Sequence, residues 1–402
     1  MTVTVVGIGA DGWAGLAPPG RDAVLTAEVL IGSARQLDLI PPEATATRLT
    51  WPSPLLPALP GLLDAHRDRH LCVLASGDPM CFGIGGTIAR LTGPGALRVV
   101  PHPSAISLAC ARLGWAVEDT EVVSVVGRPL DTLHTTIHPG RRLLVLSADG
   151  RSPAAVAELL RRRGYAGSAL TVLENLAGPT ERLTSTTAAE FPSDGGHAPL
   201  NVVAVECVAG PEAALLPTVP GLPDDAYAHD GQLTKREIRA ITLARLAPVP
   251  GQALWDVGAG AGSIAVEWMR AHPACTATAI EADEQRAARL ASNAAALGVP
   301  SLAVVRGLAP QALAGLAPPD AIFIGGGVTT DGMIDTCWAA LRPGGRLVAN
   351  AVTIESERVV TAARDALGGD LTRIEISRAG AVGGFTAWRP ALPVTQWTVR
   401  KA

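Results

Sequence analysis

The stretch LWDVGAGAGSIAVEW, residues 254–268, constrains the fold more than any other part of the chain. Its apolar start predicts a buried strand, and the apolar periodicity after Gly262 predicts a helix. The alternating glycines let the backbone turn sharply and approach a ligand closely, and the first turn of the helix points free N–H groups at that ligand. The next predicted strand ends in Glu281, about twenty residues beyond the glycines, where an acid can accept both hydroxyls of a ribose. This spacing predicts an α/β domain with a nucleotide-type cofactor site.

Short β-rich runs alternate with helical stretches along the 402 residues, which predicts an α/β fold with mainly parallel sheets. After Cys207, the sequence AGPEAALLPTVPGLPDDAYAHDGQ is rich in proline and glycine and has no periodicity, as is typical of a linker. We therefore expect a first domain at 1–209, with lobes at about 1–115 and 116–209. A linker at 210–230 and a second domain at 231–402 follow.

Composition excludes several classes of protein. A net charge of −4 and a pI near 6.1, without a basic stripe, argue against a nucleic-acid partner. The start MTVTVVGIG has no basic region and runs straight into a strand pattern, so we expect no signal peptide, and no run of about 18 apolar residues predicts a membrane span. The six cysteines lack CxxC spacing, so we expect no metal site, no disulfide framework and a cytoplasmic location.

The acid and glycines of the second-half loop are more tightly spaced than in the dinucleotide pattern G-x-G-x-x-G, because position 263 is serine. With its leading acid, the loop resembles the S-adenosylmethionine loop of Rossmann-like methyltransferases. That cofactor has no pyrophosphate to cradle, only an amino acid and an adenosine. The resemblance implies cofactor contacts at Thr234, Asp256, Gly258, Ala259, Gly260, Ala261, Gly262, Glu281 and Ala309.

Two further features of the second half bear on its role. Thr234 and Glu237 have the spacing of a capping box, which predicts a helix that starts at Thr234, and such a helix beside the pocket could combine both roles. The strand in PPDAIFIGGG lacks the Asn-Pro-Pro-Tyr element with which amino-group methyltransferases hold a nitrogen nucleophile. Its absence favours a bulky substrate that brings its own nucleophile, such as an electron-rich carbon.

A second glycine loop, VVGIGADGW at residues 5–13, does match the dinucleotide pattern, with Gly7, Gly9 and Gly12. It leaves a nicotinamide or flavin site as an alternative. Its context argues against that alternative, because Pro18-Pro19 obstruct a helix that begins at the loop. The next strand-like run ends in Gly32-Ser33 and offers no carboxylate for a ribose.

Two later stretches of the sequence indicate a different function for this loop. VLASGDPMCFGIGGTIARL, residues 73–91, predicts a strand, a turn and a helix, and VVPHPSAISLACARLG repeats that order further on. Together with the first loop they resemble the tetrapyrrole methylase family, whose members carry G-x-G-P-G, G-x-G-D-P and P-G-x-S-S elements. Members of that family hold S-adenosylmethionine in a cleft between two α/β lobes, largely by backbone groups. The resemblance implies contacts at Gly9, Gly77, Asp78, Met80 and Ser104.

The chain departs from the family pattern at several positions. Ala10-Asp11 stand where the family usually has proline, and Ser76 and His102 each replace a glycine. Asp78 could equally be a plain turn residue. We expect His102 to be a solvated loop histidine.

A tetrapyrrole-methylase half followed by a Rossmann-like half resembles, over nearly the whole chain, the bifunctional corrin-precursor methyltransferases of cobalamin biosynthesis. The resemblance implies methylation of carbons 5 and 15 of a precorrin and loss of the ring C acetate as carbon dioxide. The first half would serve carbon 5, and the second half carbon 15 and the decarboxylation. The resemblance further implies one S-adenosylmethionine site per domain, and we expect a homo-oligomer. Glu355, in NAVTIESE, is a candidate for handling a proton, with a surface carboxylate at a helix start as the alternative.

Three other functions stay open on these grounds. The first is an NAD(P)-dependent oxidoreductase that uses the N-terminal glycine loop. The second is an S-adenosylmethionine-dependent methyltransferase for another substrate, such as RNA or protein. The third is a tetrapyrrole-binding protein without catalytic activity.

Overall fold

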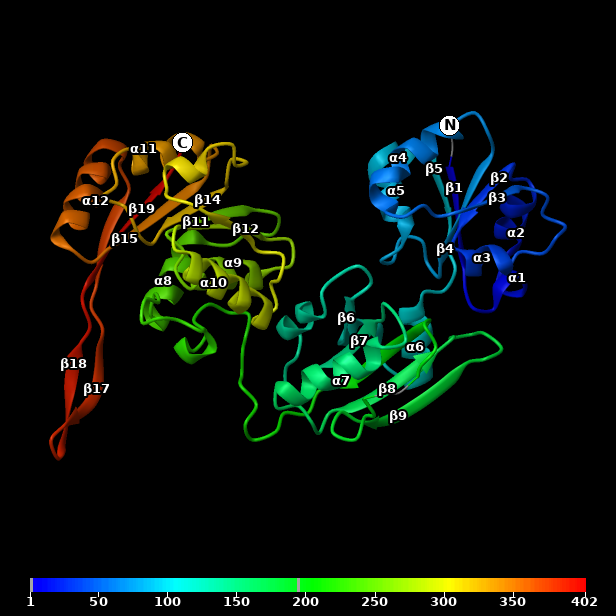
Figure 1. Ribbon diagram of the computed structural model, residues 1–402, viewed down its shortest axis with the longest axis horizontal. Helices are drawn as coiled ribbons and strands as arrows, with labels where there is room; N and C mark the ends of the chain where they lie inside the picture. Colours follow the sequence, from blue (N-terminus) through cyan, green and yellow to red (C-terminus); the bar gives the residue numbers. More distant parts are fainter. Residues whose placement is uncertain (1–2, 194–195) are drawn as a thin grey trace. The chain divides into compact units, whose positions relative to one another are not determined.

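Residues 3–193 and 196–402 are described by the computed structural model (Figure 1). The chain divides into two compact units, one made of Met1–Leu130 with Thr136–Ala214 and the other of Asp131–Thr135 with Leu215–Ala402. Within the described residues, no helix has the length and apolar character needed to cross a membrane.

The first unit begins with a parallel sheet in the order β3-β2-β4-β1-β5. Helices α4 and α5 pack on one face of it through Leu59, Leu63 and Ile88, whereas α2 and α3 pack on the other through Val24 and Leu37. Its strands are β1 (Val3–Ile8), β2 (Val29–Gly32), β3 (Thr47–Thr50), β4 (Leu71–Ser76) and β5 (Leu97–Val100). Its helices are α1 (Gly12–Gly15), α2 (Pro18–Leu25), α3 (Ala34–Asp38), α4 (Leu55–Ala65) and α5 (Ile84–Thr92).

The second sheet of this unit has the order β6-β7-β10-β8-β9 and is mixed, since only the β6–β7 pair is parallel. The α/β class is confirmed, although most of the pairs in this sheet are antiparallel. Helix α6 packs on it, although the predicted lobe boundary near residue 115 assigned that helix to the first lobe. The elements are α6 (Ala105–Leu113), β6 (Thr120–Ser124), β7 (Arg142–Leu146), α7 (Ser152–Arg162), β8 (Ala169–Glu174), β9 (Arg182–Thr187) and β10 (Asn201–Glu206).

The second unit contains a seven-stranded sheet in the order β13-β12-β11-β14-β15-β19-β16, in which β19 is antiparallel to both of its neighbours. Its strands are β11 (Ala253–Val257), β12 (Thr276–Glu281), β13 (Ala303–Arg306), β14 (Ala321–Ile324), β15 (Arg346–Ala351), β16 (Asp370–Ile374) and β19 (Val394–Arg400). Its helices are α8 (Arg236–Leu246), α9 (Ser263–Ala271), α10 (Glu284–Ala296), α11 (Met333–Ala340) and α12 (Ile354–Leu367).

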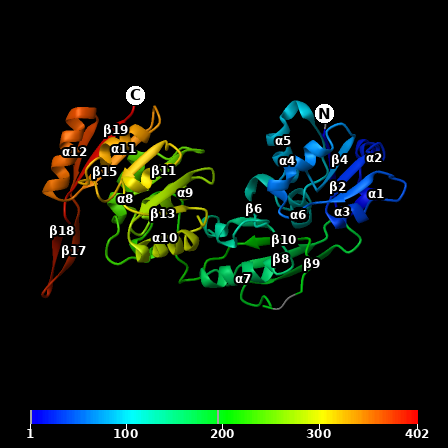
Figure 2. The same ribbon diagram turned by 45° about the horizontal axis from the view of Figure 1, so that its top comes forward.

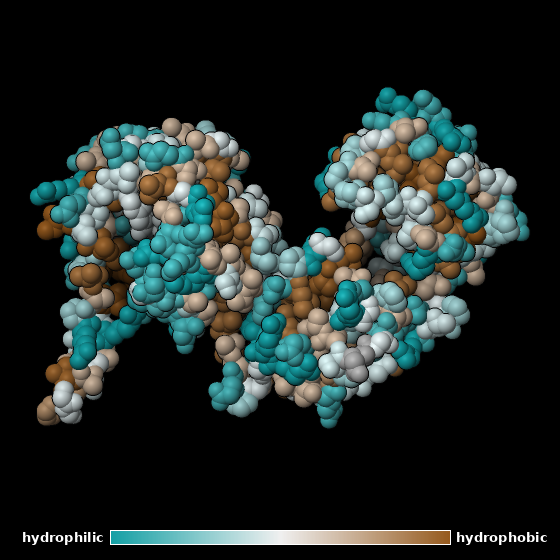
Figure 3. All heavy atoms as spheres, in the orientation of Figure 1, coloured by the Kyte–Doolittle hydropathy of each residue, from teal (hydrophilic) through white to brown (hydrophobic). Residues whose placement is uncertain are grey.

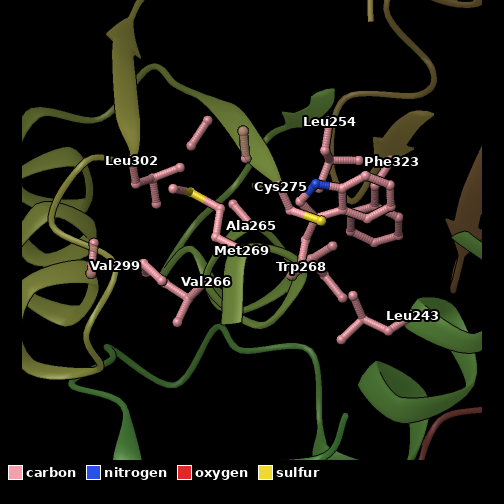
Figure 4. Close-up of a cluster of buried hydrophobic side chains, with 14 of the residues drawn as sticks. Leu243, Leu254, Ala265, Val266, Trp268, Met269, Cys275, Val299, Leu302 and Phe323 are labelled. Carbon is pink, nitrogen blue, oxygen red and sulfur yellow. The ribbon is translucent and has the colours of Figure 1, made fainter. Parts of the chain in front are cut away.

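Helices cover both faces of this sheet, as the near-continuous apolar strands require. Leu243, Trp268 and Leu290 of α8, α9 and α10 fill one face, and Cys337 and Val360 of α11 and α12 fill the other. Figure 4 shows Trp268 on the first face beside Cys275, Leu254 and Phe323. The Trp268 indole N–H also donates a hydrogen bond to the carbonyl of Thr276 at 3.0 Å, which fastens α9 to the start of β12.

A two-stranded hairpin projects from the sheet between β16 and β19 (Figures 1 and 2). It consists of β17 (Ser377–Val382) and β18 (Phe385–Pro390), which pair only with each other. Phe385 and Trp388 are 83% and 74% exposed, and hydrophobic residues are visible along the hairpin at the lower left of Figure 3. The hairpin therefore has unpaired edges and exposed apolar side chains.

Part of the predicted linker is folded into the second unit. Leu216, Leu222 and Tyr227 are buried in the core that α8, α9 and α10 share. The segment is held by Glu267 of α9, whose carboxylate accepts hydrogen bonds from the backbone N–H groups of Gly221 and Leu222 at 2.6 and 3.1 Å. The Tyr227 hydroxyl donates to the same carboxylate at 2.9 Å.

Arg239 of α8 completes this buried cluster. Its Nε lies 2.5 Å from Glu267 Oε1, and neither side chain is more than 2% exposed. Its two Nη groups donate to the carbonyls of Leu222 and Thr234, and its guanidinium lies over the Tyr227 ring, 4.9 Å from the centroid. One ion pair thus joins α8, α9 and the segment that precedes them.

Replacing Glu267 with alanine is expected to destabilise the second unit by about 3–5 kcal/mol, because Arg239 would lose its buried anion and keep only the partly exposed Asp224, 3.2 Å from its Nη1. Denaturant unfolding of the full chain, followed by tryptophan fluorescence, measures this. Asp365→Ala is the matched control, since it removes an exposed ion pair with Arg364 and should change the free energy of unfolding by at most about 1 kcal/mol. Equal effects of the two substitutions would contradict the assignment.

Candidate functional sites

The second unit has a cavity of about 880 Å³ beside the glycine loop that follows β11. Walls from β12, β14, β15 and the base of the hairpin complete it. The structure brings most of the predicted second-half residues together there: Thr234, Asp256, Gly258, Ala259, Gly260, Ala261, Glu281 and Ala309. Gly262 is outside the cavity wall.

The glycines of this loop have different structural roles. All three have a positive φ, +70° at Gly258, +56° at Gly260 and +77° at Gly262. A Cβ on Gly258 would lie 2.9 Å from the backbone of Gly326, and one on Gly262 would lie 2.5 Å from Cγ of Leu290. A Cβ on Gly260 would meet nothing closer than 3.8 Å. Gly258 therefore permits two cavity loops to approach, whereas Gly262 permits α9 to pack on α10.

Glu281 binds the glycine loop from the next strand. Its Oε2 accepts a hydrogen bond from the Gly260 N–H at 2.8 Å, and its Oε1 accepts one from the Asp283 N–H at 2.9 Å. Each carboxylate oxygen has a further lone pair that can face a ligand. The same side chain can therefore hold the loop and accept hydroxyl groups in the cavity.

Asp256 combines a cavity position with near-complete burial. Its Oδ2 accepts a hydrogen bond from the Ala265 N–H at 3.0 Å, whereas Oδ1 is buried without a partner. Burial raises the pKa of Asp256 to about 7, and the negative charge of Glu281 adds to that increase. An unpartnered oxygen at the cavity wall suits a donor group on a ligand.

Thr234 lies in the cavity wall, but the predicted capping box is wrong. Helix α8 begins one residue later, with Lys235 at the N-cap and no side-chain cap. The carbonyl of Thr234 instead accepts a hydrogen bond from Arg239 at 2.6 Å. The buried ion pair thus determines where this part of the wall lies, and the local capping signal does not.

Sequence reasoning missed several polar residues of this cavity. Asn350 lies at the end of β15, where Gln396 donates to its Oδ1 at 2.9 Å and its own Nδ2 donates to Thr242 at 3.2 Å. Arg378 and Glu237 form an ion pair in the wall beside the hairpin. A polar residue at a strand's carboxyl end was a usable signal for Asn350, whereas nothing local links Arg378 to Glu237, which is 141 positions away.

Glu355 lies in the first turn of α12, is exposed and is absent from the cavity wall. It lies between Thr353 and Ser356, which form the capping box of this helix. This position agrees with the alternative interpretation of Glu355, which is a surface carboxylate at the start of a helix. In the part of the chain that the structure describes, no hydrogen bond joins the Glu355 carboxylate to the cavity wall.

The first unit has a cavity of about 340 Å³ that is lined by residues of both its sheets. Four of the predicted contacts lie in its wall: Gly9, Gly77, Asp78 and Ser104. Met80 is exposed and lies outside that wall. Its N–H donates to Asp78 Oδ1 at 2.8 Å, so Asp78 shapes the turn as well as facing the cavity.

The turn after β5 is ordered by Ser104, the N-cap of α6. Its Oγ accepts a hydrogen bond from the Ser107 N–H at 3.1 Å. His102, two residues earlier, is only 8% exposed, so the expectation of a solvated histidine is wrong.

On the opposite wall, Arg35 and Gln36 both donate to Ser76 Oγ at 3.1 Å.

The first glycine loop lacks the geometry of a dinucleotide site. The helix that follows it, α1, has four residues and stops before a new helix begins at Pro18. A Cβ on Gly7 would overlap the Gly77 carbonyl and lie 2.8 Å from the backbone nitrogen of His102. Gly7 is therefore required for the packing of protein loops.

The raised pKa of Asp256 gives a testable pH dependence of stability. Folded Asp256 binds its proton near pH 7, whereas an unfolded aspartate does so near pH 4. Between these values the folded chain holds more protons, so the free energy of unfolding falls as the pH rises, by at most about 1.4 kcal/mol per pH unit. Asp256→Asn should remove that decline, and cofactor-free unfolding at pH 5, 6, 7 and 8 measures it. Asp365→Asn, on the surface, should follow wild type; parallel profiles for all three proteins would refute the expectation.

Comparison with known proteins agrees with both halves of this description. Residues 2–192 match the Tetrapyrrole (Corrin/Porphyrin) Methylases, and residues 225–401 match the Precorrin methyltransferase domain. A precorrin-6Y C(5,15)-methyltransferase [decarboxylating] of Sinorhizobium sp is 50% identical over 399 residues, which cover 99% of this chain and 96% of the relative.

Two shorter relatives each match less than half of the chain. A cobalt-precorrin-7 C(5)-methyltransferase of Salmonella typhimurium is 32% identical over 45% of this chain and 88% of its own length. A probable cobalt-precorrin-6B C(15)-methyltransferase (decarboxylating) of Pyrobaculum calidifontis is 34% identical over 44% of this chain and 93% of its own length. The chain belongs to the family of the decarboxylating precorrin-6Y C(5,15)-methyltransferases.

Proposed function

We propose that this protein methylates carbons 5 and 15 of a precorrin and removes the acetate of its ring C as carbon dioxide, with S-adenosylmethionine as the methyl donor. The observation that supports this best is the pair of cavities, one in each unit, each beside a glycine loop at the carboxyl ends of parallel strands. We assign one S-adenosylmethionine site to each cavity. The first unit would act at carbon 5, and the second at carbon 15 and in the decarboxylation.

The residues of the second cavity fit this cofactor. The carboxylate of Glu281 would accept the ribose hydroxyls, and the unpartnered Oδ1 of Asp256 would accept a donor from the amino-acid part. The walls at Gly258–Ala261, Thr234 and Ala309 present mainly backbone and small side chains, so a ligand can approach closely. When bound, S-adenosylmethionine supplies an electrophilic methyl group.

The first cavity fits the same cofactor by a different route. Gly77 has φ +58° and, with Gly9, exposes backbone to the cavity, while Asp78 and Ser104 supply oxygen atoms at its edge. Met80 would contribute its backbone position, because its side chain points to solvent. Among the described residues of this wall, Arg35 is the cationic side chain, and it donates a hydrogen bond to the neutral hydroxyl of Ser76. Its forked donors suit a carboxylate of the substrate.

The proposed methyl transfer and decarboxylation depend more on how the substrate is positioned than on strong acids or bases of the protein. A bridging carbon of the reduced macrocycle is enamine-like and provides its own electron pair, so the protein's contribution is to align that carbon and exclude water. Decarboxylation likewise sends its electron pair into the conjugated ring of the substrate. This agrees with an exposed Glu355, which we leave without a catalytic role.

We also propose that the protein works in a reducing cytoplasm. All six cysteines are free thiols, and five are buried. Burial raises the pKa of Cys72 and Cys337 to about 12, which keeps them protonated and unreactive.

Substitutions at one glycine in each loop should separate the two methylations in the full chain. Gly258→Ala would force a Cβ to within 2.9 Å of Gly326 at a positive φ, and should lower methylation at carbon 15 and carbon dioxide release about a hundredfold. Gly77→Ala, at φ +58° and 3.3 Å from the Pro103 carbonyl, should lower methylation at carbon 5 instead. Product masses with labelled S-adenosylmethionine, and the position of the label by NMR, measure both.

Gly61→Ala is the matched control, because a Cβ there meets nothing within 4 Å, and it should retain both methylations. Loss of both reactions in either cavity variant would argue against one site per domain. If wild type adds no methyl group to the precorrin, the proposed function itself is wrong.

We propose that the chain forms a homo-oligomer through the β17–β18 hairpin. An isolated two-stranded hairpin is marginally stable in water, and this one carries the exposed side chains of Phe385 and Trp388. A second copy of the same hairpin would pair its free edges and cover those rings.

Phe385→Ser combined with Trp388→Ser is therefore expected to shift the protein towards monomers in sedimentation velocity. Its far-ultraviolet circular dichroism spectrum, which reports secondary structure, should stay unchanged. Leu56→Ser, at an apolar position on α4 that is 64% exposed, should leave the oligomer intact. An unchanged sedimentation coefficient in the double variant would place the interface elsewhere.

A further inference from the structure

Asp11 and His102 are 91 positions apart in the sequence and meet in the structure. His102 Nε2 lies 3.1 Å from Asp11 Oδ1. Asp11 is in the loop after β1 and His102 in the loop after β5, and these strands are neighbours in the parallel sheet. The His102 side chain is 6% exposed and that of Asp11 24%, so the contact is largely shielded from water.

The buried state of His102 indicates how this contact is made. Its other ring nitrogen, Nδ1, is buried without a partner. A proton on Nδ1 would leave a buried donor unsatisfied, which costs more than an unsatisfied lone pair in a neutral ring. The arrangement therefore favours the tautomer whose Nε2–H donates to the Asp11 carboxylate.

Three glycines make room for the pair. A Cβ on Gly9 would lie 2.5 Å from Asp11 Oδ1 and 3.0 Å from His102 Nε2. A Cβ on Gly7 would lie 2.9 Å from His102 Cβ, and one on Gly15 would overlap the Asp11 carboxylate. The absence of side chains at Gly7, Gly9 and Gly15 therefore leaves the space that Asp11 and His102 occupy.

The bridge lies directly behind the first cavity. Gly9 and Ala10, which precede Asp11, are in the cavity wall, as are Pro103 and Ser104, which follow His102. Asp11 and His102 themselves are outside that wall. The contact therefore joins two neighbouring wall segments through residues that are not themselves part of the wall.

We propose that the Asp11–His102 hydrogen bond is a positioning bridge that sets the separation of the two loops and thereby the affinity of the first unit for S-adenosylmethionine. The inference rests on the proposed cofactor site in this unit. Neither residue is catalytic, because neither faces the cavity. The bridge acts through Gly9, Ala10 and Ser104.

The test is S-adenosylmethionine binding to the full chain by isothermal titration calorimetry, in a Gly258→Ala background that leaves the first site to be measured. Asp11→Ala and His102→Phe each remove one partner, and phenylalanine keeps the ring volume. Each should weaken binding about tenfold to a hundredfold, since a buried hydrogen bond to a charged group is lost. Asp11→Asn keeps an oxygen that can accept from Nε2–H, so it should bind within about threefold of the parent.

The matched control is Glu121→Ala, which removes an exposed ion pair with Arg141 in the same unit and should not change binding. In the original background, the carbon 5 methylation of Asp11→Ala should show a raised KM for S-adenosylmethionine with a smaller change in kcat, and methylation at carbon 15 should be unaffected. Equal affinities of the parent, Asp11→Ala and His102→Phe would overturn the bridge, as would an Asp11→Asn variant as weak as Asp11→Ala. Absence of binding in the parent itself would instead refute the proposed cofactor site.

Discussion

The buried ion pair between Arg239 and Glu267 is the interaction on which most of the second unit depends. Taking both charges out of water is costly, and that cost is offset only because every polar group around them is satisfied. Glu267 receives two backbone N–H groups, a hydroxyl and the guanidinium, while Arg239 donates to two carbonyls. Burial, and then the charge of Glu267, raise the pKa of Tyr227, which keeps its hydroxyl protonated as a donor. The cluster is therefore stable only when all its partners are in place.

This requirement connects the stability of the unit to its cavity. The segment around Leu222 and the start of α8 must both be ordered before Arg239 can donate to the carbonyls of Leu222 and Thr234. Thr234 is part of the cavity wall, so the ion pair positions one side of the site from behind. The other side is positioned by Glu281, which binds the N–H of Gly260. Charged side chains that face protein atoms thus hold the small and apolar residues that face the cavity.

The sequence predicted which residues gather at the second cavity, because the signals for them are local. Asp256, the glycines and Glu281 lie at the ends of two consecutive strands, and consecutive strands in α/β folds are commonly neighbours in the sheet, as β11 and β12 are. The folding of residues 215–227 was not predictable in the same way. That segment has many prolines and no periodicity, and its partners Glu267 and Arg239 carry no pattern that marks them as buried. For the same reason the capping signal at Thr234 misled, since the tertiary contact of its carbonyl decided where α8 begins.

In the first unit, the glycine pattern predicts close approaches to the backbone but does not identify what approaches it. Gly7, Gly9 and Gly12 satisfy the dinucleotide spacing, yet a Cβ on Gly7 or Gly9 would collide with protein atoms from loops about 70 and 90 positions further along the chain. A glycine reports that something comes close to the backbone, and its sequence context alone does not tell whether that is a ligand or a side chain. Asp11 and His102, read separately, each looked like a departure from a family pattern. Together they occupy the space that the glycines leave, so two departures that weaken the resemblance when taken singly are one structural feature of the site.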